Sequence, residues 1–180
     1  MSRVGAVKLF GAALVMLVLT GALAGCGGSV LGTSLDEARE ELQARPSFEQ
    51  AEKDYRALLK EVQDAVSELA PNVRWNSDEI TQIGLSFCSR PYADVKGAES
   101  AIYTAGNGGV GAPSDEVWPE VKAKVSAIAE QYGFTVGGSL KDEPGNAMLV
   151  LRDSTGASLK LGFVENTTLS VYGSCALHEN

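Results

Sequence analysis

Few residues of this sequence have the types and spacing that catalysis requires. His178 is the only histidine among 180 residues and lies two residues from the C-terminal end. A Ser-His-acid or Cys-His arrangement would therefore depend on the end of the chain, and a zinc site could use one imidazole at most. Nothing in the sequence selects a catalytic pair from the 23 acidic residues. We therefore predict no catalytic residue, metal site or cofactor, and we expect that the protein is not an enzyme.

One motif has the glycine spacing of a nucleotide-binding loop. GNGGVG, Gly106 to Gly111, has the G-x-G-x-x-G spacing. A dinucleotide site needs these glycines at the turn between a strand and a helix, with an acidic residue at the end of the next strand. Here Ala112 and Pro113 follow the motif, and the next predicted strand, FTVGGSL, has no acidic residue. We interpret the motif as a flexible loop.

The N-terminal residues are typical of an export signal. Arg3 and Lys8 precede an uninterrupted apolar run from Leu9 to Ala24. A membrane-spanning helix needs about 20 apolar residues, whereas this run has 16 and is followed by small residues. Spanning is therefore the weaker interpretation.

The stretch Leu-Ala-Gly-Cys that ends at Cys26 resembles the lipobox of bacterial lipoproteins. The resemblance implies that residues 1–25 are cleaved and that Cys26 carries a diacylglyceryl group on its sulfur. Acyl chains can hold a soluble domain stably at a bilayer. We therefore expect a lipid-anchored protein on the extracytoplasmic face of the cell membrane. The alternative is a plain signal peptide, with Cys26 free to form a disulfide.

Charge limits the partners of the exported chain. Cleavage removes two positive charges and no negative one, and so takes the formal net charge from −8 to −10. An acidic domain repels phosphate backbones and anionic headgroups. We therefore exclude nucleic acid and a polybasic mode of membrane binding.

Once Cys26 is assigned to lipid, Cys88 and Cys175 remain as a pair. Exported chains meet an oxidising compartment, so a structural disulfide is the natural hypothesis. A redox-active pair is the alternative, but it lacks Cys-x-x-Cys spacing and a nearby helix start.

Three helices are predicted to precede or separate the strands. Capping signals at Ser34–Glu37 and Ser47–Gln50 predict a short and a long helix, which end at Pro46 and Pro71. Residues 114–132 predict another long helix, because apolar residues recur there at helical spacing.

Strand signals follow two of these helices. Ile83, Leu85 and Phe87 alternate with smaller residues and predict a half-buried strand with Cys88 on its far side. Four further strands are predicted after the last helix, at 134–140, 147–153, 158–164 and 169–175. Their short connections favour an antiparallel meander.

We therefore predict an α+β domain with two main helices packed on one face of a four- to five-stranded antiparallel sheet. The chain is divided into a signal peptide at 1–25, a lipidated tether with a short helix at 26–46, and the α+β domain at 47–180.

The face of the sheet away from the helices carries a candidate interaction patch of Met148, Val150, Val164 and Tyr172. Adjacent exposed apolar residues mark contact sites. The alternative is that residues 92–103, which read either as an irregular segment or as a strand, cover this face.

The order of features resembles the LppA-type lipoproteins of actinobacteria from Phe48 to Leu177. Trp75, Cys88, Tyr132-Gly133 and Gly173–Cys175 carry the resemblance. It implies an envelope lipoprotein and supports the disulfide, and Cys26 is the only functional site that it transfers.

The predicted function is a non-enzymatic binding or structural role at the cell envelope, with an envelope protein as the expected partner. The second hypothesis is a carrier or sensor of a small apolar ligand held between helices and sheet. A hydrolase that uses unrecognised carboxylates is the third.

Overall fold

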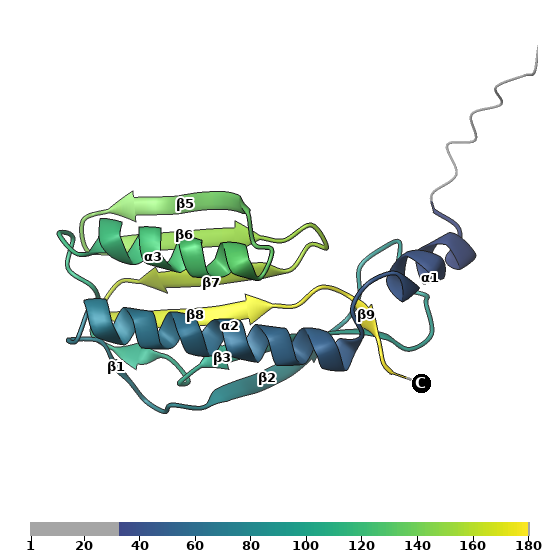
Figure 1. The fold of residues 1–180 in the computed structure, drawn as a ribbon, viewed down its shortest axis with the longest axis horizontal. Helices are drawn as coiled ribbons and strands as arrows, with labels where there is room; N and C mark the ends of the chain where they lie inside the picture. The colour runs from purple at the N-terminus through teal and green to yellow at the C-terminus, as the bar shows by residue number, and fades with distance from the viewer. Residues whose placement is uncertain (1–32, 180) are drawn as a thin grey trace, which may run out of the picture. The chain divides into compact units, whose positions relative to one another are not determined.

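The computed structural model describes residues 33–179. This part of the chain folds into three helices and nine strands, which form one antiparallel sheet system (Figure 1). The helices are α1 (Leu35–Gln43), α2 (Phe48–Leu69) and α3 (Trp118–Gln131). The strands are β1 (Arg74–Trp75), β2 (Ile80–Ser86), β3 (Ala98–Ala105), β4 (Gly109–Val110), β5 (Val136–Glu143), β6 (Asn146–Arg152), β7 (Ser158–Phe163), β8 (Asn166–Tyr172) and β9 (Ala176–Leu177).

The predicted antiparallel meander is formed by β5, β6, β7 and β8. Both β3 and β4 pair with β8 along its free edge, β2 and β9 pair with β3, and β1 pairs with β4. The prediction of four to five strands was therefore too low. Three of the additional strands, β1, β4 and β9, have two residues each, which is too short for an alternating pattern to show.

The two long helices cover one face of the sheet, as predicted (Figure 1). Helix α2 packs on β3 and β8, and α3 packs on α2 and β6. The inward residues of the meander are all buried in this main core: Leu149, Leu151, Leu159, Leu161, Phe163, Leu169 and Val171. Helix α1 lies apart from them and contacts β9 instead.

The capping signals position the helices as expected. Ser34 and Glu37 form a complete capping box at α1, and the Ser47 hydroxyl accepts from the Gln50 N–H at α2. Helix α3 begins later than predicted, at Trp118, with Pro119 in its first turn.

The glycine motif is an ordered bend that carries the chain from β3 into β4. Gly106 and Gly111 have φ values of +57° and +93°. A Cβ atom would lie 2.5 Å from the Ser77 carbonyl oxygen at Gly106 and 2.4 Å from the Asn72 carbonyl oxygen at Gly111. The glycines are therefore required because backbone packs against backbone here, which refines the interpretation of a flexible loop.

The prediction that Ile83, Leu85 and Phe87 face the core was wrong. They are 59%, 60% and 102% exposed, whereas Cys88 is buried. Strand β2 pairs only with β3 and so forms an edge, and α2 lies mainly over β3 and β8. A bulge between Gln82 and Gly84 also interrupts its alternation.

Residues 92–103, for which the sequence favoured neither an irregular segment nor a strand, contain both. Residues 90–97 form turns, and β3 then enters the sheet between β2 and β8. Because β3 is a member of the sheet, it does not cover the face away from the helices.

Candidate functional site

The predicted disulfide between Cys88 and Cys175 is present, with Cα atoms 5.6 Å apart. Cys88 follows β2, and Cys175 lies between β8 and β9. Cys175 packs against a second, smaller hydrophobic cluster, the α1 cluster, whose buried members are Ala38, Leu42 and Val95. The disulfide therefore fastens the end of the domain that carries α1.

Polar contacts around Arg45 reinforce the α1 cluster. The Arg45 guanidinium lies 4.6 Å from the centre of the Tyr92 ring and 2.5 Å from the Glu41 carboxylate. Hydrogen bonds from Tyr92 and then from Arg45 lower the pKa of Glu41, while burial and the bond to Glu41 raise the pKa of Tyr92. These three side chains hold α1 against the turn that begins at Tyr92.

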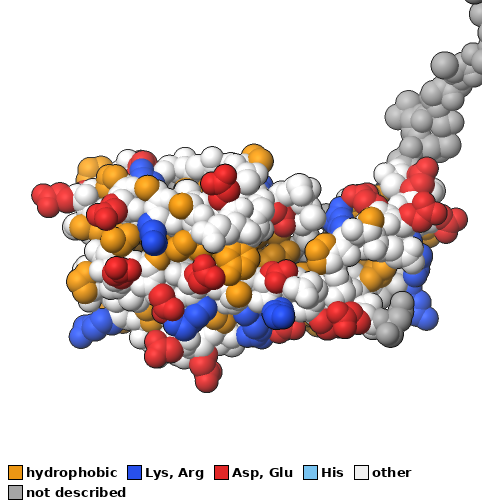
Figure 2. Space-filling model, viewed as in Figure 1, with side chains coloured by type: hydrophobic (Ala, Val, Ile, Leu, Met, Phe, Trp, Pro, Cys, Tyr) orange, Lys and Arg blue, Asp and Glu red, His pale blue; other side chains and the backbone are white. Residues whose placement is uncertain are grey.

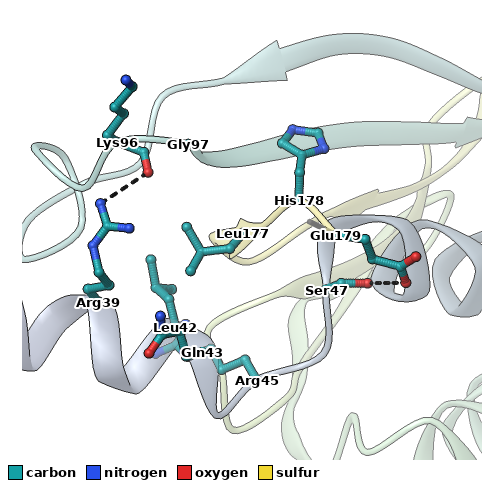
Figure 3. Close-up of a pocket in the computed structure, with 10 residues that line it drawn as sticks. All are labelled: Arg39, Leu42, Gln43, Arg45, Ser47, Lys96, Gly97, Leu177, His178 and Glu179. Atoms are coloured by element: carbon teal, nitrogen blue, oxygen red, sulfur yellow. Dashed lines mark hydrogen bonds between the residues drawn. The ribbon is translucent and has the colours of Figure 1, made fainter.

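An open pocket of about 330 Å³ lies beside this cluster (Figure 3). Its walls come from α1, the turn at Lys96–Gly97 and the C-terminal segment at Leu177–Glu179. The Arg39 guanidinium donates to the Lys96 carbonyl at 3.4 Å, and the Ser47 hydroxyl donates to the Glu179 carboxylate at 2.9 Å. The pocket is thus rimmed by side chains of both signs, as Figure 3 shows.

His178 borders the pocket, but both of its ring nitrogens are engaged. Nδ1 lies 2.7 Å from the Glu49 carboxylate and Nε2 lies 3.2 Å from that of Glu99. Hydrogen bonds with Glu49 and then Glu99 raise the pKa of His178. The Ser47 hydroxyl donates to Glu179 and not to the imidazole. This arrangement ties the C-terminal segment to α2 and β3, and it does not activate a nucleophile.

The structure divides the candidate interaction patch. Met148 and Val164 are 38% and 60% exposed and line a shallow depression of about 370 Å³ around Gly162. Val150 is 2% exposed, so its inclusion was wrong. It lies on β6 between Gly138 of β5 and Lys160 of β7, with a neighbouring strand on either side.

Tyr172, 41% exposed, belongs to a second group on the same sheet face. Arg152, Ser158 and Tyr172 form one row across β6, β7 and β8. The Lys160 ammonium lies 3.8 Å from the centre of the Tyr172 ring. Among the ion pairs of the described residues, none includes Arg152 or Lys160. The face therefore presents two cations beside an aromatic ring.

Space for a small ligand inside the described domain is limited. A partly enclosed cavity of about 100 Å³ lies next to Tyr55, Tyr132 and Phe134. Small-molecule sites usually occupy about 300–1,000 Å³. This cavity gives no support to the hypothesis of an apolar ligand held between helices and sheet.

Sequence reasoning missed one surface, which we call the β2 ridge: Ile83, Leu85 and Phe87. The alternation of a strand looks the same whether or not a helix covers its apolar face. Gly84 inside the strand was the available signal, because an interior glycine often marks a bulge.

Cys26 lies outside the described residues. In residues 33–179 no helix combines the length and apolarity needed to cross a membrane. The same residues contain no group of three or more His, Cys, Asp or Glu side chains that could hold a metal ion.

Comparisons with known proteins place the chain in a family. The crystal structure of LppA from Mycobacterium tuberculosis matches it with a TM-score of 0.57 and 21% identity, over 80% of this chain and 87% of that one. At this identity the match shows a shared fold. No curated protein matches significantly. The LppA family, described as a lipoprotein confined to pathogenic Mycobacterium, matches residues 28–179. Because this match spans most of the sequence, the chain belongs to the LppA lipoprotein family.

Proposed function

We propose that the protein is an envelope lipoprotein that binds a partner protein without catalysing a reaction. In this proposal residues 1–25 are cleaved, and lipid on Cys26 holds the domain at the outer face of the cytoplasmic membrane. Membership of a lipoprotein family supports the anchor, and the lipobox at Cys26 identifies the residue. Acyl chains contribute about 0.8 kcal/mol per buried methylene, which makes a multiply acylated anchor stable.

The observation that carries the binding role is the uncovered face of the sheet. Both long helices lie on the opposite face. On the open face Lys160 stacks on Tyr172, and Arg152 lies in the same row as Tyr172. Aromatic and arginine side chains are enriched in protein interfaces.

The charge of this face indicates the chemistry of the partner. Arg152 and Lys160 belong to no ion pair within the described residues. The exported chain as a whole is acidic. A local pair of cations on an acidic domain favours an acidic segment of an envelope protein, since complementary charge sets specificity and association rate.

The anchor is tested by comparing the unsubstituted protein with Cys26→Ala in the native host. We expect the unsubstituted protein to incorporate labelled fatty acid and to sediment with membranes, and the variant to do neither. A variant that still takes up label and stays with membranes would contradict the proposed anchor.

The binding face is tested by placing a photo-crosslinking amino acid at Tyr172 and, as the matched control, at exposed Lys124 on α3. We expect a discrete protein adduct from position 172 only, and its loss when Lys160→Glu and Arg152→Glu are added. Equal adducts from both positions, or an adduct that survives the charge reversals, would count against the proposal.

A further inference from the structure

We propose that the β2 ridge rests against the bilayer to which the protein is anchored, and so decides which end of the domain faces the lipid. This inference rests on the lipid anchor proposed above. It concerns a different surface from the cationic sheet face.

The ridge has the chemistry of a membrane contact. Three large apolar side chains within five residues are at least 59% exposed, and Phe87 is fully exposed. Leu85 lies opposite Ala101 in the register of β2 with β3, on the side of the sheet that carries the helices. Helix α2 lies over β3 and β8 instead and leaves the ridge uncovered. Contiguous exposed apolar groups of this kind mark contact surfaces.

The ridge lies at the end of the domain where the described chain begins. Phe87 precedes Cys88, whose disulfide partner Cys175 packs against the α1 cluster. Thr33, the first described residue, lines one shallow hollow together with Arg90. Arg90 is two residues beyond Cys88. The start of the domain and the C-terminal end of the ridge therefore lie toward the same end of the domain.

The covalent chain keeps this end close to the anchor. Seven residue steps separate Cys26 from Thr33. A fully extended chain of that length spans at most about 25 Å, whatever conformation it takes. Apolar groups bind a bilayer by entering the boundary between headgroups and acyl chains. The β2 ridge is a group of three exposed apolar side chains at this end of the domain, and the short connection can bring it to the membrane.

Two observations favour an uncharged lipid surface over a second copy of the chain as the occupant. Acidic side chains gather over α1 (Figure 2), so the contact is apolar and does not require anionic headgroups. Strand β2 is an edge that another copy could extend, but the bulge between Gln82 and Gly84 interrupts such pairing.

The experiment uses the full lipidated protein in vesicles of zwitterionic phosphatidylcholine, with or without bromine atoms near the headgroup end of the acyl chains. Tryptophan is placed on the ridge by Phe87→Trp or Leu85→Trp, and at the control position by Val164→Trp. Val164 is 60% exposed, like Leu85, but it lies at the other end of β8 from Cys175. The unsubstituted protein already contains Trp75 and Trp118, which pack in the main core. Its quenching is therefore measured separately and subtracted from that of each variant.

We expect brominated lipid to reduce the emission of the two ridge tryptophans and to leave that of Val164→Trp unchanged. Flotation with the vesicles reports the anchor separately. If the protein floats but the tryptophans at 85 and 87 are not selectively quenched, this inference alone is overturned. It is also overturned if the emission of the ridge tryptophans shifts to the blue as the protein density on the vesicles rises, without quenching by bromine. That result would identify a second copy of the chain as the occupant. A protein that does not float overturns the proposed anchor and this inference with it.

Discussion

The main core and the α1 cluster belong to one domain but are held together by different means. The main core buries side chains from α2, α3 and the sheet, with Leu58 and Leu161 at 0% exposure. The α1 cluster buries three residues. It adds the Cys88–Cys175 disulfide and the contacts of Arg45 with Tyr92.

The difference shows how a small cluster remains attached to a large one. Burial stabilises in proportion to the apolar area removed from water, and three residues provide little of it. Covalent and polar links therefore replace packing at the end of the domain that carries α1. Regions with few buried contacts open at lower free energy than the rest of a fold, so α1 is expected to open first.

The largest expected effect comes from removing the disulfide with Cys88→Ala and Cys175→Ala. The bond closes a loop with a sequence separation of 87, and the entropy of closing such a loop corresponds to about 4.6 kcal/mol of stability. Urea unfolding of the variant and the oxidised protein measures the loss. A loss below about 1 kcal/mol would mean that the disulfide contributes little to holding this end of the domain together.

Truncation of the main core is expected to have the next largest effect. Leu161→Ala leaves a cavity in a fully buried site and should lower the free energy of unfolding by about 3 kcal/mol. The matched control is Leu140→Ala, at 69% exposure on edge strand β5. Its loss should stay within about 0.5 kcal/mol in the same urea titration. Similar losses for both variants would contradict the described core.

A leucine-to-alanine substitution in the α1 cluster should lower the global free energy of unfolding by less than the one in the main core. Leu42 is 1% exposed, yet Leu42→Ala is expected to lower the global free energy of unfolding by about 1 kcal/mol. The reason is that α1 can detach while the main core stays folded. Hydrogen exchange should show lost protection in residues 35–43 and unchanged protection in α2. A loss as large as that of Leu161→Ala would show that the two clusters unfold together.

The smallest effect concerns pH. Hydrogen bonds with Glu49 and Glu99 raise the pKa of His178 above its ordinary value of 6.5. The protonated imidazole therefore contributes stability that is complete below the unfolded pKa and is lost as pH rises through the folded pKa. Urea midpoints of the unsubstituted protein and His178→Gln should differ at about pH 5.5 and converge at about pH 8.5. An unchanged difference across this range would contradict the charged contact.

The N-terminal caps of α1 and α2, the meander and the disulfide were predictable because their causes are local or countable. Ser34 with Glu37 caps α1 within one turn, and the inward leucines of β7 follow a period of two. Cys88 and Cys175 remained as the available pair once Cys26 was assigned to lipid. The placement of the β2 ridge and of Val150 was not predictable, because each depends on which strands and helices become neighbours.

By itself the sequence determined the family, the α+β class, and the elements with a strong period or cap, and it predicts an export signal and a lipobox. Only the tertiary structure decided that β3 and β4 both line the edge of β8, that α2 leaves β2 bare, and that His178 lies between Glu49 and Glu99. Caps and periodicities act over a few residues of the chain. The exposure of a strand face or the charge of an imidazole depends on residues far apart in sequence that meet only when the domain folds.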